Sequence, residues 1–130
     1  MSDDLVQFLR ARLDEDAALA AEATQETTGR WTARETDWGG GTVVEDDCGA
    51  LILPTGHSAT QYPHIAHHSP ARVLAEVEAK RRTLGRHHDF QGWCAGCGND
   101  LTYRTNDCPE LRALASVYAE HPDYRDEWRP

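Results

Sequence analysis

The sequence is poor in several residue types, and each shortage limits what the protein can be. Lysine occurs once, and 13 basic residues are outnumbered by 22 acidic ones, which gives a formal net charge of −9. An acidic chain lacks the broad basic surface on which non-specific nucleic-acid binding depends. No apolar run approaches the roughly 18 residues that a membrane-spanning helix needs. The composition therefore predicts a protein without a membrane span, whose surface charge keeps it in solution.

The chain also lacks the patterns of secretion and of the common catalytic motifs. Residues 1–4 (MSDD) are acidic where a signal peptide carries positive charge, so we expect no signal peptide and a cytoplasmic location. There is no Gly-rich phosphate loop, no Gly-x-Ser-x-Gly motif and no plausible Ser/His/Asp triad. We therefore assign no catalytic residue and favour a role other than catalysis.

The length and the aromatic content predict a single α+β domain. The chain has 130 residues, with four Trp and four Tyr as large core anchors, and a domain takes about 150 residues. Apolar residues spaced three and four apart predict a helix over residues 3–24. Segments of strand composition at 30–34, 42–45 and 50–53 are separated by residues 39–41 (GGG) and by a turn at 46–49 (DDCG). They predict a small antiparallel β-meander, followed by a loop over 54–69.

A long central helix is the clearest element of the pattern. Ser69 is a good N-cap and Pro70 suits the first helical position, so the helix should run from there to about His87. Residues 93–98 (WCAGCG) read as a tight loop and residues 101–104 as a short strand. Pro109 should open a last helix whose apolar face comprises Leu111, Leu114, Val117 and Tyr118. We expect a body over residues 1–88 and an appendage over 89–130 that consists of a zinc knuckle and a helix. Tyr124 and Trp128 of the tail should pack back on the body.

The strongest chemical signal is a cysteine cluster in the last third of the chain. Cys94 and Cys97 form a Cys-x2-Cys pair followed by Gly98, a spacing that lets both thiolates face one ion while glycine relieves the left-handed turn. Cys108 stands before the Pro-initiated helix, where the helix dipole favours a thiolate. Together they predict a structural zinc site. A redox pair or a disulfide is the alternative. Structural disulfides are rare in intracellular proteins, so we expect none here.

The fourth ligand should come from the end of the central helix. His87 is the first choice because it lies three residues after Leu84, which faces the core; His88 is the alternative. Cys48, His121 or a carboxylate are further possibilities. Four protein ligands leave no open position for substrate, so we expect the zinc to be structural.

Two other groups of residues carry weaker signals. His64 and His68 have the spacing of a metal pair on one helical face, with His67 beside them, but Pro63 and Pro70 leave room for barely one turn, and a His-rich loop is the simpler interpretation. His57 is expected to be a solvent-facing loop residue. Positively charged residues cluster at the end of the central helix, near two aromatic residues. This group could bind single-stranded nucleic acid. The simpler interpretation is that cations are common at a helix C-terminus, where the helix dipole attracts them. It comprises Lys80, Arg81, Arg82, Arg86, His87 and His88, with Phe90 and Trp93 following.

Three segments resemble an uncharacterised family of short actinobacterial and phage-encoded proteins. They are residues 4–16 (DLVQFLRARLDED), 64–82 (HIAHHSPARVLAEVEAKRR) and 108–130, which begins CPELRALA. The resemblance spans nearly the whole chain and implies that a histidine at the position of His87 precedes the Cys-x2-Cys pair. It implies no activity, because the domain that these proteins share is of unknown function.

These observations predict a small zinc-stabilised accessory or interaction protein whose partner is another protein. A zinc-knuckle nucleic-acid-binding module is the alternative, disfavoured by the net charge, and a small zinc hydrolase with three protein ligands and a water is a further one.

Overall fold

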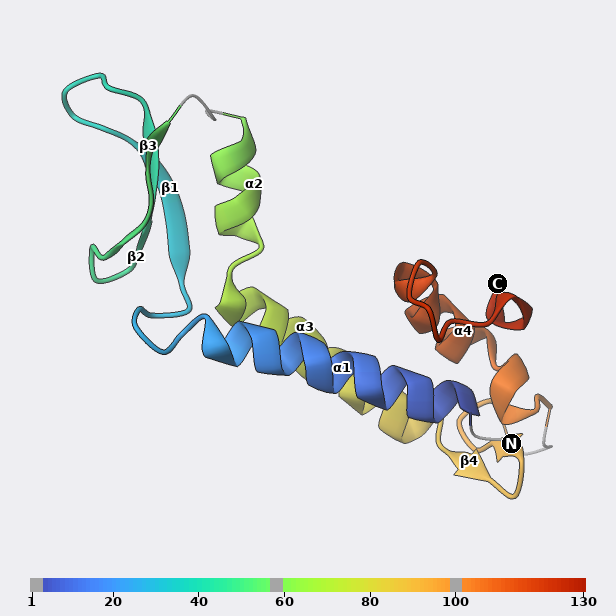
Figure 1. Cartoon of the computed structure of the whole chain (residues 1–130). Coiled ribbons are helices and arrows are strands. Elements are labelled where there is room, and N and C mark those ends of the chain that lie inside the picture. Colours follow the sequence, from blue (N-terminus) through green and yellow to red (C-terminus); the bar gives the residue numbers. More distant parts are fainter. Residues whose placement is uncertain (1–3, 57–59, 99–101) are drawn as a thin grey trace. The chain divides into compact units, whose positions relative to one another are not determined.

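The computed structural model describes residues 4–56, 60–98 and 102–130 and has the expected α+β architecture (Figure 1). The main elements, in chain order, are α1 (Asp4–Glu22), β1 (Trp31–Glu35), β2 (Thr42–Asp46), β3 (Leu51–Gly56), α2 (Gln61–His67), α3 (Pro70–Arg86), β4 (Asp89–Phe90), β5 (Trp93–Cys94) and α4 (Pro109–Ala115). Within the described ranges, none of the helices combines the length and the apolar character that crossing a membrane demands.

The chain forms two compact units. One comprises the residues up to 15 together with residues 77–130, and the other comprises residues 16–76. The first contains the cysteine cluster, and the second contains the three-stranded sheet. Each unit is described by itself below.

The unit of residues 16–76 is built on the predicted antiparallel meander. Its strand order is β1-β2-β3, and the central strand β2 buries Val43 and Val44. Helix α2 packs against β1 and β2. The predicted loop over 54–69 is wrong in part, because β3 continues to Gly56 and α2 spans Gln61–His67. Pro63 does not prevent this helix, since it lies in the first turn, where the missing N–H has no helical partner.

The turn that joins β2 to β3 is organised by a buried carboxylate. The backbone N–H groups of Thr28, Cys48 and Ala50 donate to the Asp46 side chain at 2.9, 2.9 and 2.8 Å. These donors, of which the Thr28 N–H has the largest effect, lower the pKa of Asp46 against the opposing effect of burial. Asp46 is therefore held as a carboxylate, and it ties residue 28 to the β2–β3 turn.

In the other unit, the first turns of α1 pack on the C-terminal part of the chain. Leu5, Leu9 and Leu13 are almost fully buried, as the predicted stripe requires. The predicted packing of the tail is confirmed, because Trp128 is 2% exposed and its ring centroid lies 5.1 Å from that of Phe8. Residues far apart in the chain are thus joined in one core.

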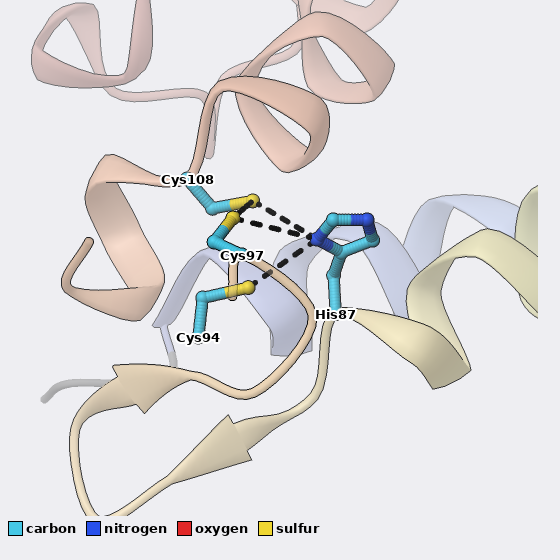
Figure 2. Close-up of side chains that lie close together, drawn as sticks. All are labelled: His87, Cys94, Cys97 and Cys108. Carbon is cyan, nitrogen blue, oxygen red and sulfur yellow. Dashed lines mark hydrogen bonds between the residues drawn. The ribbon is translucent and has the colours of Figure 1, made fainter. Parts of the chain in front are cut away.

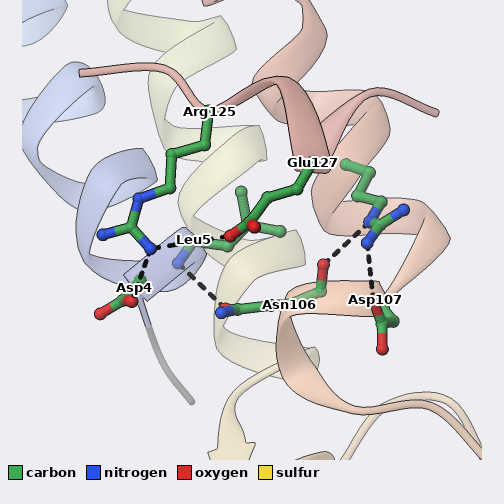
Figure 3. Close-up of polar contacts among 7 residues, drawn as sticks. Asp4, Leu5, Asn106, Asp107, Arg125 and Glu127 are labelled. Carbon is green, nitrogen blue, oxygen red and sulfur yellow. Dashed lines mark hydrogen bonds and ion pairs between the residues drawn. The ribbon is translucent and has the colours of Figure 1, made fainter. Parts of the chain in front are cut away.

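Polar contacts fasten the same segments at the start of α1. The Leu5 N–H donates to Asn106 Oδ1 at 3.1 Å, and Arg125 pairs with Asp4 at 2.9 Å (Figure 3). Arg112 donates to the Asn106 carbonyl at 2.8 Å, which holds the segment before α4 against α4 itself. The backbone ahead of α4 is therefore fixed on both sides.

Helix α4 begins as predicted and ends sooner than its apolar pattern suggests. Pro109 is its first residue, and Leu111 and Ala115 are buried. The predicted face is wrong at Val117, which is 69% exposed. The chain tightens into a 3₁₀ turn at Ser116–Tyr118, and this change of pitch rotates Val117 away from the buried side.

A short β-hairpin occupies residues 89–94, and its second strand includes the first two residues of the loop predicted over 93–98. Asp89 pairs with Cys94 and Phe90 with Trp93 in antiparallel register. The two turn residues, Gln91 and Gly92, have φ values of 54° and 89°, as a type I′ turn requires. Of the predicted strand over 101–104, Leu101 lies outside the described residues, and Arg104 forms a single antiparallel bridge with Trp93.

Candidate metal centre

Four segments of one unit bring the candidate ligands together. His87 directly follows α3, Cys94 ends β5, Cys97 lies in the loop after β5, and Cys108 precedes α4 (Figure 2). Cys94 and Cys108 are fully buried, and His87 and Cys97 are half-buried. The core of the unit thus holds each ligand at the end of an element or in a tight loop.

The loop that carries Cys97 depends on two glycines. Gly98 has a φ of 109°, in the region that the sequence analysis anticipated for the residue after the pair. Gly96 lies so close to the end of α3 that a Cβ on it would meet the Arg86 carbonyl oxygen at 2.3 Å and His87 Nδ1 at 2.8 Å. We call residues 94–98 the cysteine knuckle. It can approach His87 this closely only because residue 96 has no side chain.

Cys108 lies directly before helix α4, as the position of Pro109 predicted. It is the N-cap of α4, and its carbonyl accepts a hydrogen bond from the Arg112 N–H at 3.0 Å. Its own N–H donates to the Thr105 carbonyl at 3.2 Å. Because Thr105 N–H donates to the Gly92 carbonyl at 3.1 Å, the segment before Cys108 is tied to the hairpin turn.

The four ligand atoms lie close to one another. His87 Nδ1 lies 3.3 Å from the sulfur of Cys94, 3.5 Å from that of Cys108 and 3.6 Å from that of Cys97 (Figure 2). The sulfurs of Cys97 and Cys108 are 3.4 Å apart, and all four ligand atoms lie within 4.8 Å of one another. This cluster could hold a metal ion.

The spacing fits a tetrahedral ion with three sulfur ligands and one nitrogen ligand. Metal–sulfur and metal–nitrogen bonds of about 2.3 and 2.05 Å imply nitrogen–sulfur edges of about 3.5 Å and sulfur–sulfur edges of about 3.8 Å. The observed separations from Nδ1 are 3.3 to 3.6 Å. The cysteines are free thiols, and the 3.4 Å between Cys97 and Cys108 exceeds a disulfide bond of about 2.05 Å.

Without a cation, the thiols of Cys94 and Cys97 resist ionisation. Burial, together with the neighbouring Cys108 and Cys94 thiols, raises the pKa of Cys97 to about 12. Burial also raises the pKa of Cys94, against a hydrogen bond from the Gly96 N–H. A reactive or redox cysteine needs a lowered pKa, so these surroundings argue against a nucleophile. A metal ligand is a thiolate as well, and a bound cation would lower the pKa of these thiols.

The other candidates for the fourth ligand lie elsewhere. His88 is turned to the end of α3, with Nδ1 3.0 Å from the Gly85 carbonyl. His121 contacts Arg12, whose Nη1 is 2.8 Å from His121 Nδ1. Cys48 is exposed in the β2–β3 turn of the other unit. The structure therefore brings His87, the first choice, to the three cysteines.

The second candidate site contains histidines without a further ligand. His64 and His67 lie in α2 and His68 caps it, with ring centroids 4.6 Å apart for His64 and His68. Burial and the neighbouring His64 lower the pKa of His68. Within the described ranges, the cluster at His87 is the only group of three or more His, Cys, Asp or Glu ligands gathered closely enough for an ion. His57 lies outside the described residues.

Two features of the site were missed from the sequence. The close approach of Gly96 to Arg86 has no local signal, since it depends on two segments meeting in space. The Arg104 guanidinium lies 4.3 Å from the centre of the Trp93 ring. Only the pairing of residues 93 and 104 reveals this contact.

Comparison with known proteins supports the resemblance to a family of unknown function and assigns the chain no activity. A model of a family of unknown function, DUF6221, matches residues 2–130, so the chain belongs to that family. No curated protein and no solved structure matches the chain. Any function therefore has to be argued from the site itself.

Proposed function

We propose that the protein is a small zinc-stabilised binding or accessory protein, in which His87, Cys94, Cys97 and Cys108 hold one structural zinc ion. The observation that carries the proposal is the close approach of His87 Nδ1 and the three sulfurs, which lie within 4.8 Å of one another. Three thiolates and an imidazole form a common ligand set for structural zinc, and thiolates select zinc over magnesium or calcium.

The position of the cluster gives the ion a structural task. The ligands come from the end of α3, the β4–β5 hairpin, the following loop and the start of α4. Two short strands and a seven-residue helix offer little stability by themselves. A bound ion would supply part of the folding free energy of this region, as it does in zinc fingers.

A catalytic role has less support than a structural one. A hydrolytic zinc ion needs three protein ligands and a water, whereas four ligand atoms converge here. The ligands themselves are half-buried or fully buried. We therefore favour binding over catalysis.

Native mass spectrometry with elemental analysis of the purified protein tests the proposal. We expect one zinc ion per chain, and its removal by a chelator should unfold the region around the hairpin and α4. Cys97→Ser should lose the ion, whereas Cys48→Ser, which removes an exposed thiol of the other unit, should keep it. His87→Gln and His88→Gln form a second matched pair, of which only the first should weaken binding.

The same spectrum separates the alternatives. A metal-free chain with a mass lower by two hydrogens would show a disulfide and would contradict the proposal. A metal-free chain with all thiols reduced and unchanged thermal stability in Cys97→Ser would contradict it as well.

A further inference from the structure

The outer face of the β4–β5 hairpin carries an aromatic and cationic platform. Residues directly opposite each other in an antiparallel pair point to the same face, and neighbours along a strand point to opposite faces. Because Cys94 turns inward to the cluster, Trp93 turns outward, and its partners Phe90 and Arg104 share that face. We call Phe90, Trp93 and Arg104 the platform.

The platform is accessible and arranged for stacking. Phe90 is 55% exposed, so most of its ring can be reached from solvent. Trp93 is half-buried, and the exposed Arg104 lies over its ring at 4.3 Å. An arginine held on an aromatic face keeps its N–H groups free for an anion. The platform thus offers ring faces beside a fixed cation.

The charge around the platform is opposite to that of the rest of the chain. Residues 80–104 contain five basic and two acidic residues, whereas the remainder contains eight basic and 20 acidic residues. The net charge of −9 therefore conceals a basic segment, and that segment includes the platform. Local charge, rather than net charge, decides where a polyanion binds.

The cations of this segment differ in whether a carboxylate already neutralises them. Arg81 pairs with Asp14 and Arg82 with Glu78. Among the described residues, Arg86 and Arg104 form no ion pair. The Arg86 guanidinium donates a hydrogen bond to the Thr83 hydroxyl at 3.4 Å, and the Arg104 guanidinium lies over the Trp93 ring. Both side chains are exposed. They are available for phosphate groups.

The acidic residue of the hairpin is turned away from the platform. Asp89 pairs with Cys94 and so lies on the inner face. Its carboxylate accepts hydrogen bonds from the Thr105 hydroxyl and from the Gly92 N–H. A carboxylate engaged in this way opposes a polyanion on the outer face less than a free one would.

From this face we propose that the platform binds single-stranded nucleic acid, with bases stacking on Phe90 and Trp93 and phosphates contacting Arg104. Stacked aromatics beside unpaired arginines are the combination with which proteins bind single strands with little sequence preference. A duplex fits less well, because its bases are already stacked on one another. The inference rests on the proposed function, since the zinc ion would hold the inner face of the same hairpin.

The test is fluorescence anisotropy of the zinc-loaded full-length protein with a labelled oligothymidylate of about 15 nucleotides. We expect saturable binding that weakens as salt rises from about 50 to 200 mM, and weaker binding to a duplex of equal length. Phe90→Leu keeps an apolar side chain but removes the ring, and it should weaken binding about tenfold. Phe90→Trp keeps an aromatic ring at this position, so it should bind the oligonucleotide as tightly as the wild type does.

Two further variants complete the design. Arg104→Gln should weaken binding. It should also reduce by about one the slope of the logarithm of the binding constant against the logarithm of the salt concentration. Trp38→Ala removes an aromatic side chain that is 73% exposed in the other unit, and it should bind like the wild type. Zinc content is measured in every sample, so that loss of the ion is not mistaken for loss of the platform.

Three results would overturn the inference. The first is no salt-dependent binding by a zinc-loaded wild type, and the second is equal binding by Phe90→Leu and Trp38→Ala. The third is self-association that Phe90→Leu abolishes without any oligonucleotide binding, which would make the platform a protein contact. A wild type that carries no metal would instead contradict the proposed function, and the two failures are thereby distinguishable.

Discussion

Gly96 lies directly against the backbone of Arg86, at the point where the cysteine knuckle meets the end of α3. A Cβ on residue 96 would approach the Arg86 carbonyl oxygen to 2.3 Å, which no side chain tolerates. Backbone, rather than a flexible side chain, forms this contact, so the knuckle itself would have to move. The position of Cys97, the next residue, depends on that contact.

We therefore predict that Gly96→Ala weakens metal binding. Displacing the knuckle moves Cys97 away from His87 Nδ1, which lies 3.6 Å from its sulfur. Changes that misplace a ligand without removing it cost about 10–100-fold in metal affinity, and we expect a loss of this size. Competition with a chromophoric chelator at neutral pH measures the affinity.

Gly85→Ala is the matched control. Gly85 is the second-to-last residue of α3, and a Cβ there would have nothing within 4 Å. Alanine is the better helix former, so this variant should keep the metal affinity without lowering the free energy of unfolding. Wild-type metal affinity in Gly96→Ala would show that the knuckle does not need the close approach.

The elements that could be predicted from the sequence are those with a local cause. Pro70 and Pro109 mark the starts of α3 and α4 because proline suits the first helical turn. The spacing of Cys94 and Cys97, with Gly98 after them, is likewise a local pattern. Both kinds of signal can be read within a few residues. Helices begin at both prolines, and Cys94 and Cys97 lie close together.

The features that could not be predicted depend on segments that meet in space. The β4–β5 hairpin has two residues in each strand, too few to show alternation. Helix α2 was concealed by Pro63, which reads as a break until its place in the first turn is known. Arg104 reaches Trp93 through a bridge across ten residues of chain.

The turn of the β4–β5 hairpin should be stabilised by a single substitution. Gln91 has a φ of 54°, a left-handed conformation that costs a residue with a Cβ about 1–2 kcal/mol. Asparagine adopts this conformation more readily and is preferred in type I′ turns. Gln91→Asn should therefore raise the free energy of unfolding by about 0.5–1 kcal/mol, measured by urea unfolding of the zinc-loaded protein.

Gly92→Ala tests the same turn in the opposite direction. Gly92 has a φ of 89°, so an alanine there should lower the free energy of unfolding. If Gln91→Asn were destabilising while Gly92→Ala had no effect, the turn would not have the type I′ geometry.

Acid should weaken the unit of residues 16–76 through Asp46. The pKa of Asp46 is lowered in the folded chain, chiefly by the Thr28 N–H, so its carboxylate contributes stability above the unfolded value of about 3.9. That contribution is lost as the pH falls through the lowered pKa, because protonation removes the acceptor. Urea unfolding between about pH 5 and pH 2 should show the loss in the wild type.

Asp46→Asn isolates this effect. Asparagine keeps the size of the side chain but has no carboxylate, so the variant should be less stable at neutral pH and its unfolding should depend less on acid. Asp47→Asn is the control, since Asp47 is exposed in the same turn. Identical acid profiles for the wild type and Asp46→Asn would mean that other carboxylates govern the acid transition.

Two tryptophans should differ sharply in their contribution to stability. Trp128 is 2% exposed and packs against Phe8 and Tyr124, with ring centroids 5.1 and 5.8 Å away. Removing a buried tryptophan side chain costs about 3–5 kcal/mol, so Trp128→Ala should release the tail from α1. Trp38 is 73% exposed, and Trp38→Ala should change the free energy of unfolding by less than about 0.5 kcal/mol. Chemical unfolding followed by circular dichroism compares the two, and a Trp128→Ala variant as stable as Trp38→Ala would contradict the packing of the tail on α1.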